Sequence, residues 1–535
     1  MAMLKKTIVL LLCLLSFQAN AKTVYYVKSG ATGDGSSWSN ASGSIQDMID
    51  KASAGDEVWV AHGTYLPPMD PSMTYYIRYY FKSGISLYGG FKGVETKLEQ
   101  REKKDRNQNG KVEPWEFANE TVLSANVGSK SRKWTVDDEN HVLEVQESNY
   151  DDYLYLMADF NSTGYSKDTY LSGFKITDGR EFLSIDGEDR LVILECEVCY
   201  NNHNSHLFYC HESSQVSIKE SSFHHNIGEI VNQADAIDNS LFFHNHCDAS
   251  SYFSNLPIKG DRMNNCEVYD NVITGSYYAP FVVVNICRDS RIYNNLVGSC
   301  IQCEELYDTE VFKNKGEASI TQTARNCLFY QNEGVGVNAY SLGAKLYDCE
   351  IYQNWEGVGG GELHDCIIHD NKTHGVEGST LYNCNVYNNA GTGINGGSAY
   401  NCHIYNNKGG GARGTNLYDC IVENNTTEKD GGGISGGYAY NCIIRNNFAV
   451  GNGGGYHENG YDMYYLENCQ IYGNEALNDG GGIWSGRAIV RGCSIFNNKA
   501  GATGGGVSNS SCSNCDIYNN YAPSYGGIAE VHPKS

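Results

Sequence analysis

Proline is scarce in this sequence, with 8 residues in 535, and basic residues are few beside acidic ones. Low proline suits long ladders of β-strands, in which nearly every backbone N–H is needed for pairing. With 39 Lys and Arg against 63 Asp and Glu, the net charge of −24 argues against nucleic acid as a partner, because phosphates attract basic surfaces. No apolar run after residue 21 is long enough to cross a membrane, so we expect no transmembrane segment.

Residues 1–21 have the layout of a secretory signal peptide. The start "MAMLKK" is basic, "TIVLLLCLLSF" is apolar, and "ANA" ends at Ala21 in a small-residue cleavage pattern. The sequence therefore predicts export to the extracellular space, the outer surface or the periplasm, with a mature chain that starts near Lys22.

A short phrase recurs through the second half of the chain, as in "DCIIHDN", "NCNVYNN" and "NCHIYNN". Its rule is Cys, any residue, Ile/Val/Phe, usually an aromatic residue, a polar residue and Asn. Sixteen copies run from Cys196 to Cys515, and Asn stands five places after the cysteine position in all of them. Four copies replace the cysteine, with Ser221, Ser240, Ser290 and Thr309.

The spacing inside each copy indicates a short β-strand. The cysteine and the aliphatic residue two places later share one face of a strand, and no helical periodicity is present. One such strand cannot bury its apolar face alone, so the copies must stack as successive turns of a solenoid. We expect the Asn column to lie at a bend, in left-handed backbone, with its amides bonded from turn to turn. We expect the cysteines, an odd 19 after removal of Cys13, to be mainly buried free thiols.

Two motifs carry a resemblance to known families. The "GGGI/GGGV" segments paired with "IxxN/FxxN" are similar to the repeats of polymorphic outer-membrane proteins. The stretch "SGSIQDMIDKASAGDEVWVAHGTYLP" resembles the opening of secreted right-handed parallel β-helix proteins of the pectin-lyase-like superfamily, in which an amphipathic helix plugs the first turn. The resemblance implies an all-β, right-handed parallel β-helix. We expect a signal peptide (1–21), a cap and first turns (22–92), an insertion (93–126) and the β-helix (127–535).

The insertion contains the twelve residues "DRNQNGKVEPWE", which have the spacing of an EF-hand calcium loop. The preceding "VETKLEQREKK" could form a helix. The alternative is a polar turn without an ion. A single loop of this kind fits a structural calcium site better than a sensor, which pairs two loops. The expected ligand residues are Asp105, Asn107, Asn109, Lys111 through its carbonyl, Glu113 through water, and Glu116.

Two further columns are candidate sites. His225, His244 and Asp270 occupy the same repeat position in successive copies, which would place them side by side in reach of a metal or a transferred proton. The alternative is a polar column at a bend. Aromatic residues also recur three places after the cysteine position, facing outward, either as a shield for the sheet or as a platform for sugar rings. The candidates for ligand binding are Tyr330, Tyr352, Tyr387 and Tyr405.

The repeat is regular and no acid–base pair stands out. We therefore favour a non-catalytic secreted or cell-surface protein, adhesin-like, that binds an extracellular glycan or another surface ligand. The alternative is a polysaccharide lyase or glycoside hydrolase that acts on an extracellular glycan, since the resembling superfamily holds enzymes and non-catalytic proteins alike.

Overall fold

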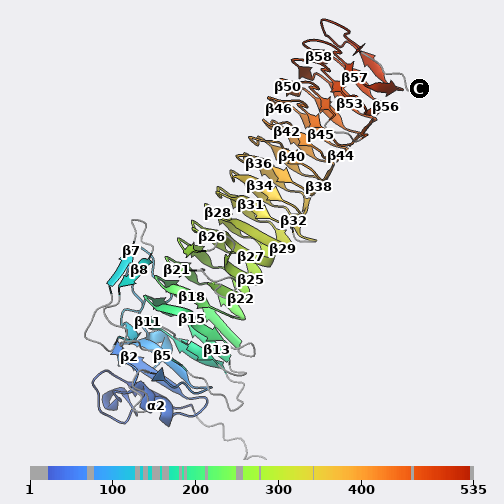
Figure 1. Ribbon diagram of the computed structural model, residues 1–535. Coiled ribbons are helices and arrows are strands. Elements are labelled where there is room, and N and C mark those ends of the chain that lie inside the picture. Colours follow the sequence, from blue (N-terminus) through green and yellow to red (C-terminus); the bar gives the residue numbers. More distant parts are fainter. Residues whose placement is uncertain are drawn as a thin grey trace, which may run out of the picture. The chain divides into compact units, whose positions relative to one another are not determined.

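The computed structural model describes residues 22–68, 78–126, 133–136, 142–146, 157–158, 168–179, 183–185, 190–210, 215–248, 257–275, 279–340, 343–458 and 463–529. The predicted signal peptide lies outside these residues. The chain divides into two compact units, residues 1–241 and 242–535, which are described separately (Figure 1). Among the described residues, no helix has the length and apolar character of a membrane span.

The first unit contains the predicted amphipathic helix, α2 (Ile45–Lys51), together with the short 3-10 helices η1 (Trp38–Asn40) and η2 (Leu98–Gln100). Ser44 caps α2 by accepting a hydrogen bond from the Asp47 backbone N–H at 3.1 Å. Ile45 and Ile49 are buried against the neighbouring strands β1 and β2. The helix that the resemblance implied is therefore present, and its apolar residues are buried.

Parallel strands build the rest of the first unit, stacked one turn on the next (Figure 1). One set of paired strands contains β1 (Val24–Val27), β2 (Glu57–Ala61), β5 (Ser86–Phe91), β10 (Asp168–Ser172), β13 (Arg190–Leu194), β16 (Gln215–Lys219) and β19 (Ala236–Asp238). The second contains β3 (Gly63–Tyr65), β6 (Thr121–Ser124), β11 (Phe174–Thr177), β14 (Glu197–Cys199) and β17 (Ser222–His224). The third contains β12 (Leu183–Ile185), β15 (Asn202–Cys210) and β18 (Ile227–Val231). Two smaller pairs are β4 (Arg78–Tyr79) with β9 (Met157–Ala158), and the antiparallel β7 (Lys133–Val136) with β8 (Val142–Gln146). Strand β20 (Leu241–Phe243) crosses the boundary between the two units.

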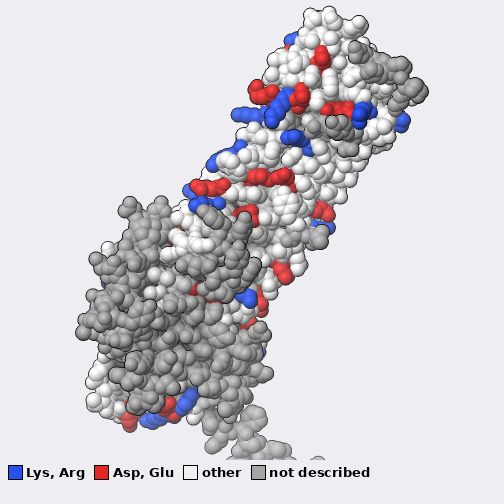
Figure 2. All heavy atoms as spheres, viewed as in Figure 1, with Lys and Arg blue, Asp and Glu red and all other residues white. Residues whose placement is uncertain are grey.

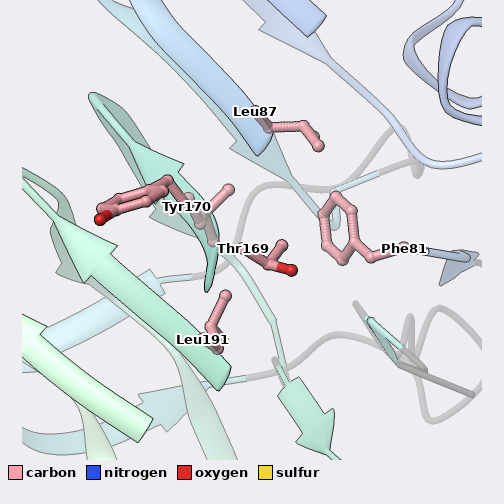
Figure 3. A pocket seen from close by; sticks show the side chains of 6 residues that line it. Phe81, Leu87, Thr169, Tyr170 and Leu191 are labelled. Carbon is pink, nitrogen blue, oxygen red and sulfur yellow. The ribbon is translucent and has the colours of Figure 1, made fainter. Parts of the chain in front are cut away.

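A small cavity lies between β5, β10 and β13 in the first unit (Figure 3). Its volume is about 10 Å³, and Phe81, Leu87, Tyr170 and Leu191 line it with Thr169. This is room for about one water molecule, and the lining is apolar. Thr169 Oγ1 is engaged, since it accepts a hydrogen bond from the Gly84 backbone N–H at 2.7 Å. The cavity is therefore a packing gap and too small for a ligand.

The second unit is a stack of parallel turns (Figure 1). Its first turns use long strands, namely β22 (Ile258–Asn264), β25 (Pro280–Arg288), β27 (Ser299–Tyr307) and β29 (Glu317–Arg325). One continuing ladder contains β31 (Val335–Asn338), β34 (Glu356–Gly359), β37 (Val376–Glu377), β40 (Ile394–Asn395), β43 (Ala412–Arg413), β47 (Ile434–Ser435), β51 (Tyr456–His457), β55 (Ile483–Trp484), β59 (Val507–Ser508) and β62 (Ile528–Ala529). The other contains β32 (Lys345–Tyr347), β35 (Glu362–His364), β38 (Thr380–Tyr382), β41 (Ser398–Tyr400), β44 (Asn416–Tyr418), β48 (Ala439–Tyr440), β52 (Tyr465–Glu467), β56 (Ile489–Arg491) and β60 (Ser511–Ser513).

The cysteine phrase itself forms a separate ladder of three-residue strands in the second unit. It contains β23 (Glu267–Tyr269), β26 (Arg291–Tyr293), β28 (Glu310–Phe312), β30 (Leu328–Tyr330), β33 (Glu350–Tyr352), β36 (Ile367–His369), β39 (Asn385–Tyr387), β42 (His403–Tyr405), β45 (Ile421–Glu423), β49 (Ile443–Arg445), β53 (Gln470–Tyr472), β57 (Ser494–Phe496) and β61 (Asp516–Tyr518). Short strands also pair as β21 (His246–Asp248) with β24 (Val272–Thr274), and as β46 (Thr426–Thr427), β50 (Phe448–Ala449), β54 (Glu475–Ala476) and β58 (Lys499–Ala500). The prediction of an all-β parallel solenoid is confirmed.

One turn shows how the phrase folds. Leu381, Cys384 and Val386 point into the core, each at most 1% exposed. The chain bends at Asn383 and Asn388, which have φ values of +55° and +56°. This left-handed backbone is one that Asn adopts more readily than most residues. Each copy therefore supplies two bends with one short strand between them.

The invariant Asn is buried, and its amide links successive turns as predicted. Asn407 Oδ1 accepts hydrogen bonds from the backbone N–H and the side-chain amide of Asn389, both at 3.0 Å. Asn407 Nδ2 in turn donates to the carbonyl of Val386 at 3.1 Å. The expected left-handed backbone was assigned one residue too late, because the residue before the invariant Asn makes the bend. The invariant Asn instead satisfies buried polar groups inside it.

The described cysteine side chains, 18 in number, are all free thiols, and most are buried. Cys402 illustrates the column, because its Sγ donates to the Tyr400 carbonyl at 3.3 Å and accepts from the Cys384 backbone N–H at 3.4 Å. On the face of the second unit that is drawn in Figure 2, acidic and basic side chains form short separate rows across an uncharged surface.

Candidate functional site

The predicted calcium loop folds around its own side-chain oxygens. Asp105 accepts hydrogen bonds from the backbone N–H groups of Asn109 at 3.2 Å and Gly110 at 2.9 Å. Asn107 Oδ1 accepts from the Asn109 N–H at 3.0 Å, and Asn109 Oδ1 accepts from the Lys111 N–H at 2.8 Å. Gly110 has a φ of +88°, which glycine adopts without steric cost. The oxygens at the first, third and fifth loop positions thus all face the backbone of the same turn.

Glu116 closes the loop from its twelfth position. Its Oε1 accepts from the backbone N–H groups of Arg106 at 3.3 Å and Asn107 at 3.2 Å, and its Oε2 accepts from the Glu113 N–H at 3.0 Å. Glu116 is only 2% exposed. The Glu113 carboxylate pairs with Lys111 Nζ at 2.9 Å. The structure therefore gathers the six predicted ligand residues into one turn, with oxygen donors of the kind that Ca²⁺ prefers.

The segment before the loop is not the expected helix. Only η2 (Leu98–Gln100) is helical, and the chain then pairs with the segment after the loop. The Lys104 N–H donates to the Glu116 carbonyl at 2.9 Å, and the Ala118 N–H donates to the Glu102 carbonyl at 2.8 Å. Extended backbone sends alternate side chains to the same side, which a helix at this point would not do.

That alternation attaches the insertion to the solenoid of the first unit. Arg101 Nη2 lies 2.8 Å from Glu195 Oε2, and Lys103 Nζ lies 2.5 Å from Glu195 Oε1. Arg101 also stacks its guanidinium 4.7 Å above the ring centroid of Phe117. These groups are largely removed from water, with the Arg101 and Glu195 side chains 9% and 15% exposed. Ion pairs with this degree of burial couple more strongly than surface pairs do.

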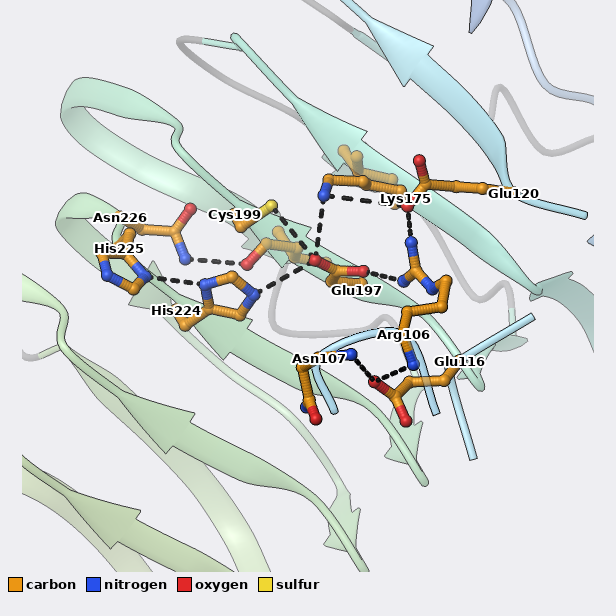
Figure 4. A network of polar contacts seen from close by, with 12 residues as sticks. Arg106, Asn107, Glu116, Glu120, Lys175, Glu197, Cys199, His224, His225 and Asn226 are labelled. Carbon is orange, nitrogen blue, oxygen red and sulfur yellow. Dashed lines mark hydrogen bonds and ion pairs between the residues drawn. The ribbon is translucent and has the colours of Figure 1, made fainter. Parts of the chain in front are cut away.

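A second buried network lies beside the calcium loop and is centred on Glu197 (Figure 4). Glu197 Oε1 lies 3.1 Å from Lys175 Nζ and 3.3 Å from His224 Nε2, while Glu197 Oε2 pairs with Arg106, the second residue of the loop. Burial opposes ionisation of Glu197, but the hydrogen bond from His224 and the charges of Lys175 and Arg106 outweigh it, so its pKa lies well below the usual range. Arg106 also pairs with Glu120.

Glu197, Cys199 and His224 form a possible metal-binding group. Their donor atoms all lie within 4.8 Å of one another. Burial raises the pKa of the Cys199 thiol, however, and Lys175 already occupies the same carboxylate oxygen that a metal would use. We therefore interpret the group as part of the ion network that holds the insertion. The sequence offers one signal for this group, because Cys199 stands three residues after Cys196 in a CxxC spacing.

Of the predicted column, His225 belongs to the first unit, and His244 and Asp270 belong to the second. His225 has its Nδ1 2.8 Å from the Nδ1 of His224, and its ring stacks on Tyr200 at 5.0 Å. His244 Nε2 lies 3.6 Å from Asp270 Oδ2 within the second unit. All three have φ values between +52° and +53°. They therefore occupy the left-handed bend position, as the alternative interpretation of a polar column expects.

The aromatic column of the second unit stacks without a break from Phe243 to Tyr405. Neighbouring ring centroids are 4.7–5.1 Å apart and the ring planes differ by at most 10°. The stack, which we call the first ladder, consists of Phe243, Tyr269, Tyr293, Phe312, Tyr330, Tyr352, His369, Tyr387 and Tyr405. Stacking inside the ladder occupies the ring faces, so no sugar ring can lie between them. What the ladder presents outward is a row of ring edges and hydroxyl groups.

The hydroxyl groups of the first ladder are hydrogen-bond donors at neutral pH. Burial and the neighbouring Glu310 raise the pKa of Tyr330 to about 12. Burial also raises the pKa of Tyr352, Tyr387 and Tyr405. Tyr330 donates its hydroxyl proton to Glu310 Oε2 at 3.3 Å, which leaves an acceptor lone pair on its oxygen.

Sequence reasoning missed a second ladder on the neighbouring strands. It consists of Tyr347, His364, Tyr382, Tyr400 and Tyr418, with centroids 4.8–5.0 Å apart. The signal was present in the sequence, because an aromatic residue or His stands two places before the cysteine in "LYDC", "LHDC", "LYNC" and "AYNC". The four turns that contain Cys349, Cys366, Cys384 and Cys402 therefore each carry two stacked rings, one before and one after the cysteine.

Comparisons with known proteins find similarity to solved structures of low identity. A pectate lyase matches over 77% of this chain and 76% of its own, with 12% identity and a TM-score of 0.22. The A-module of a mannuronan C-5 epimerase from Azotobacter vinelandii matches over 95% and 97%, with 12% identity and a TM-score of 0.16. A rhamnogalacturonan lyase matches over 76% and 82%, with 13% identity and a TM-score of 0.15. No family model and no curated protein matches the sequence. At these identities and TM-scores, the similarities carry no conclusion about activity.

Proposed function

We propose that this protein is a non-catalytic, exported binding protein, secreted or held at the cell surface, that attaches to an extracellular glycan in the manner of an adhesin. The observation that supports this proposal is the pair of aromatic ladders in the second unit. They present a ring edge at successive turns, about 4.8 Å from the next, and most of these rings are tyrosines that carry a hydroxyl group. A polymer with its own repeat can meet many such groups at once.

The ring faces are stacked against one another and are not available to a ligand, which determines the mode of binding. Tyrosine hydroxyls and ring edges would contact sugar hydroxyls by hydrogen bonding, in place of stacking. Each such bond contributes roughly 0.5–1.5 kcal/mol net, so a single tyrosine would bind weakly. Successive contacts along one polymer act as linked sites, and affinity grows without any new kind of contact.

We further propose that the calcium loop holds a structural Ca²⁺ ion. Asp105, Asn107, Asn109 and Glu116 would supply side-chain oxygens, with the Lys111 carbonyl and a water held by Glu113 completing the set. Arg106 supports this role, because it belongs to the loop and also pairs with Glu197 in the buried network. Ordering the loop would thereby order the attachment of the insertion.

The binding proposal is tested by removing hydroxyl groups while keeping the stack. Tyr330→Phe, Tyr352→Phe, Tyr387→Phe and Tyr405→Phe are combined in one variant, since Phe312 shows that the first ladder accepts phenylalanine. Binding to a polysaccharide array should fall about tenfold or more for the combined variant and only about twofold for each single change. The melting temperature should stay close to that of the natural protein.

The matched control makes the same Tyr→Phe substitution at four positions of the second ladder, Tyr347, Tyr382, Tyr400 and Tyr418. Comparison of the two combined variants shows which ladder binds the ligand. Unchanged binding in both combined variants contradicts the proposal. Release of new sugar ends from a glycan, abolished by one substitution in one patch, would instead establish a lyase or hydrolase.

A further inference from the structure

A groove of about 370 Å³ opens on the second unit, on a different part of the surface from the first ladder. Its floor is the outward side of β43, β47 and β51, where Arg413, Ser435 and His457 follow one another in register. Parallel pairing places these side chains about 4.8 Å apart along the axis. Its walls are the bends of adjacent turns, including residues 391–392, 408–409 and 427–430. The volume lies in the range of ligand-binding clefts.

The charges of the groove set it apart from the rest of this acidic chain. Lys408, Arg413 and Lys429 are exposed and line it together. Among the residues that the structure describes, none of these three side chains has an ion-pair or hydrogen-bond partner. Some other cations of the unit are paired, as Lys345 is with Glu362 at 3.2 Å and Lys499 with Glu475 at 2.6 Å, whereas three cations without such a partner line this one groove.

The two carboxylates of the groove, Asp430 and Glu428, offset only two of its three cations. Asp430 Oδ1 accepts a hydrogen bond from the Asn452 backbone N–H at 2.6 Å, and its Oδ2 faces His457 Nε2 at 3.7 Å. His457 is held in place by stacking on Trp484, with centroids 4.6 Å apart. Glu428 is exposed. Three free cations thus converge on one hollow in which one of the two carboxylates is already engaged.

We propose that this groove binds a short acidic oligosaccharide, with a carboxylate or sulfate group held by Arg413, Lys408 and Lys429. The proposal rests on the proposed glycan-binding function and adds a second site and a ligand class to it. An arginine guanidinium pairs with both oxygens of such an anion, and lysine adds charge. The Ser435 hydroxyl lies between Arg413 and His457 on the groove floor, where a sugar hydroxyl would meet it.

A single-stranded nucleic acid fits the groove less well. Its bases need aromatic faces for stacking, and the aromatic side chains among the groove-lining residues are only the imidazoles of His374 and His457. The net charge of −24 also repels a long polyphosphate. An acidic oligosaccharide needs only nearby cations for its acid groups and hydrogen-bond partners for its hydroxyl groups, and the groove supplies both.

The test is calorimetric titration of the full mature chain with four probes: a sulfated hexasaccharide, hexameric oligogalacturonate, neutral cellohexaose and a hexadeoxynucleotide. The groove variant combines Lys408→Gln, Arg413→Gln and Lys429→Gln. The control combines Lys313→Gln, Lys315→Gln and Lys372→Gln, which removes the same charge from exposed lysines outside the groove. Affinity for an acidic saccharide should fall at least about tenfold in the groove variant and less than about twofold in the control.

The two acidic probes distinguish a sulfate site from a carboxylate site. Equal affinities in the groove variant and the natural protein overturn the proposal, and so does a natural protein that binds neither acidic probe. Equally tight, groove-dependent binding of the hexadeoxynucleotide overturns the saccharide assignment. If the combined Tyr→Phe variant of the first ladder loses binding while the groove variant does not, the proposed function stands and the groove site falls.

Discussion

The third position after the repeat cysteine has opposite uses in the two units. In the first unit it holds Cys199 and His224, which belong to a buried polar network. In the second unit the same position holds the rings of the first ladder, such as His369 and Tyr387. The backbone does not differ, since β14–β17 and β36–β39 are both three-residue parallel pairs with an uninterrupted register.

What differs is the part of the chain that packs over the outward face of the strand, which we call the cover; in the first unit it is the insertion, residues 93–126. In the first unit the insertion places Arg106 against Glu197 and Lys103 against Glu195, so outward side chains there are shielded from water and must be matched in charge. In the second unit the first ladder shields itself by stacking ring on ring. A solenoid position therefore has no fixed chemistry, and what lies above it determines which residues are stable there.

The largest expected effect on the free energy of unfolding comes from removing the charge of Glu197 from its buried network. Glu197→Gln keeps the size of the side chain but leaves Lys175 and Arg106 to share the single carboxylate of Glu120, and breaking a buried charge pair typically costs about 3–5 kcal/mol. We discount this to roughly 2–4 kcal/mol, because the Lys175 and Arg106 side chains are each 25% exposed and water partly screens them. Denaturant unfolding of the first unit measures the loss.

The matched control is Glu310→Gln in the second unit, beside Tyr330, where the carboxylate side chain is 38% exposed and the cost should stay below about 0.5 kcal/mol. The pH dependence has a definite sign. Because the folded state lowers the pKa of Glu197, its contribution is fully present above its ordinary pKa of 4.5 and is lost as the pH falls further. The difference between the natural protein and Glu197→Gln should therefore shrink on acidification, and a constant difference would contradict the network.

Calcium removal should loosen the insertion without unfolding the parallel β-strands of the solenoid. EDTA, or Asp105→Ala combined with Glu116→Ala, should speed proteolysis within residues 93–126 and leave the β-sheet circular dichroism unchanged. A ligand at about 100 times its dissociation constant stabilises by about 2.7 kcal/mol, which gives the scale of the expected effect. Asn109→Asp is an informative control, since it keeps an oxygen ligand. If protease sensitivity and calcium content stay the same in the double variant, the loop is only a turn.

Thiol labelling then separates the two uses of cysteine. Cys199 lies under the insertion, whereas Cys402 lies in the core column. Both should resist labelling in the native protein. Under EDTA the labelling rate of Cys199 should rise, while that of Cys402 changes only on global unfolding. Equal acceleration at both positions would show that the insertion does not cover the network.

The sequence predicted the solenoid because its strongest signals are repeated. The Asn and cysteine columns recur in register, so periodicity alone placed Cys384 in the core and stacked Asn389 on its equivalents in neighbouring turns. It did not predict the Glu197 network, because the contact between Arg106 and Glu197 joins residues 91 apart and follows no period. The groove was missed for a related reason, since Lys408 and Lys429 stand in bends whose lengths vary from turn to turn. The second ladder was a readable signal that was overlooked.

The smallest expected effect is the most direct test of the comparison. His369 and His224 occupy the same repeat position, and both side chains are 13% exposed. His369→Tyr should change stability by less than about 0.5 kcal/mol, because a tyrosine continues the stack between Tyr352 and Tyr387. The contacts of its ring nitrogens with the exposed carboxylates of Glu350 and Asp370, which the change removes, contribute little. His224→Tyr should cost more, since it removes the partner of Glu197 Oε1 and adds volume to a filled site. Urea unfolding of both variants measures the difference. Equal costs would mean that the repeat position, and not the cover above it, determines which residues are tolerated.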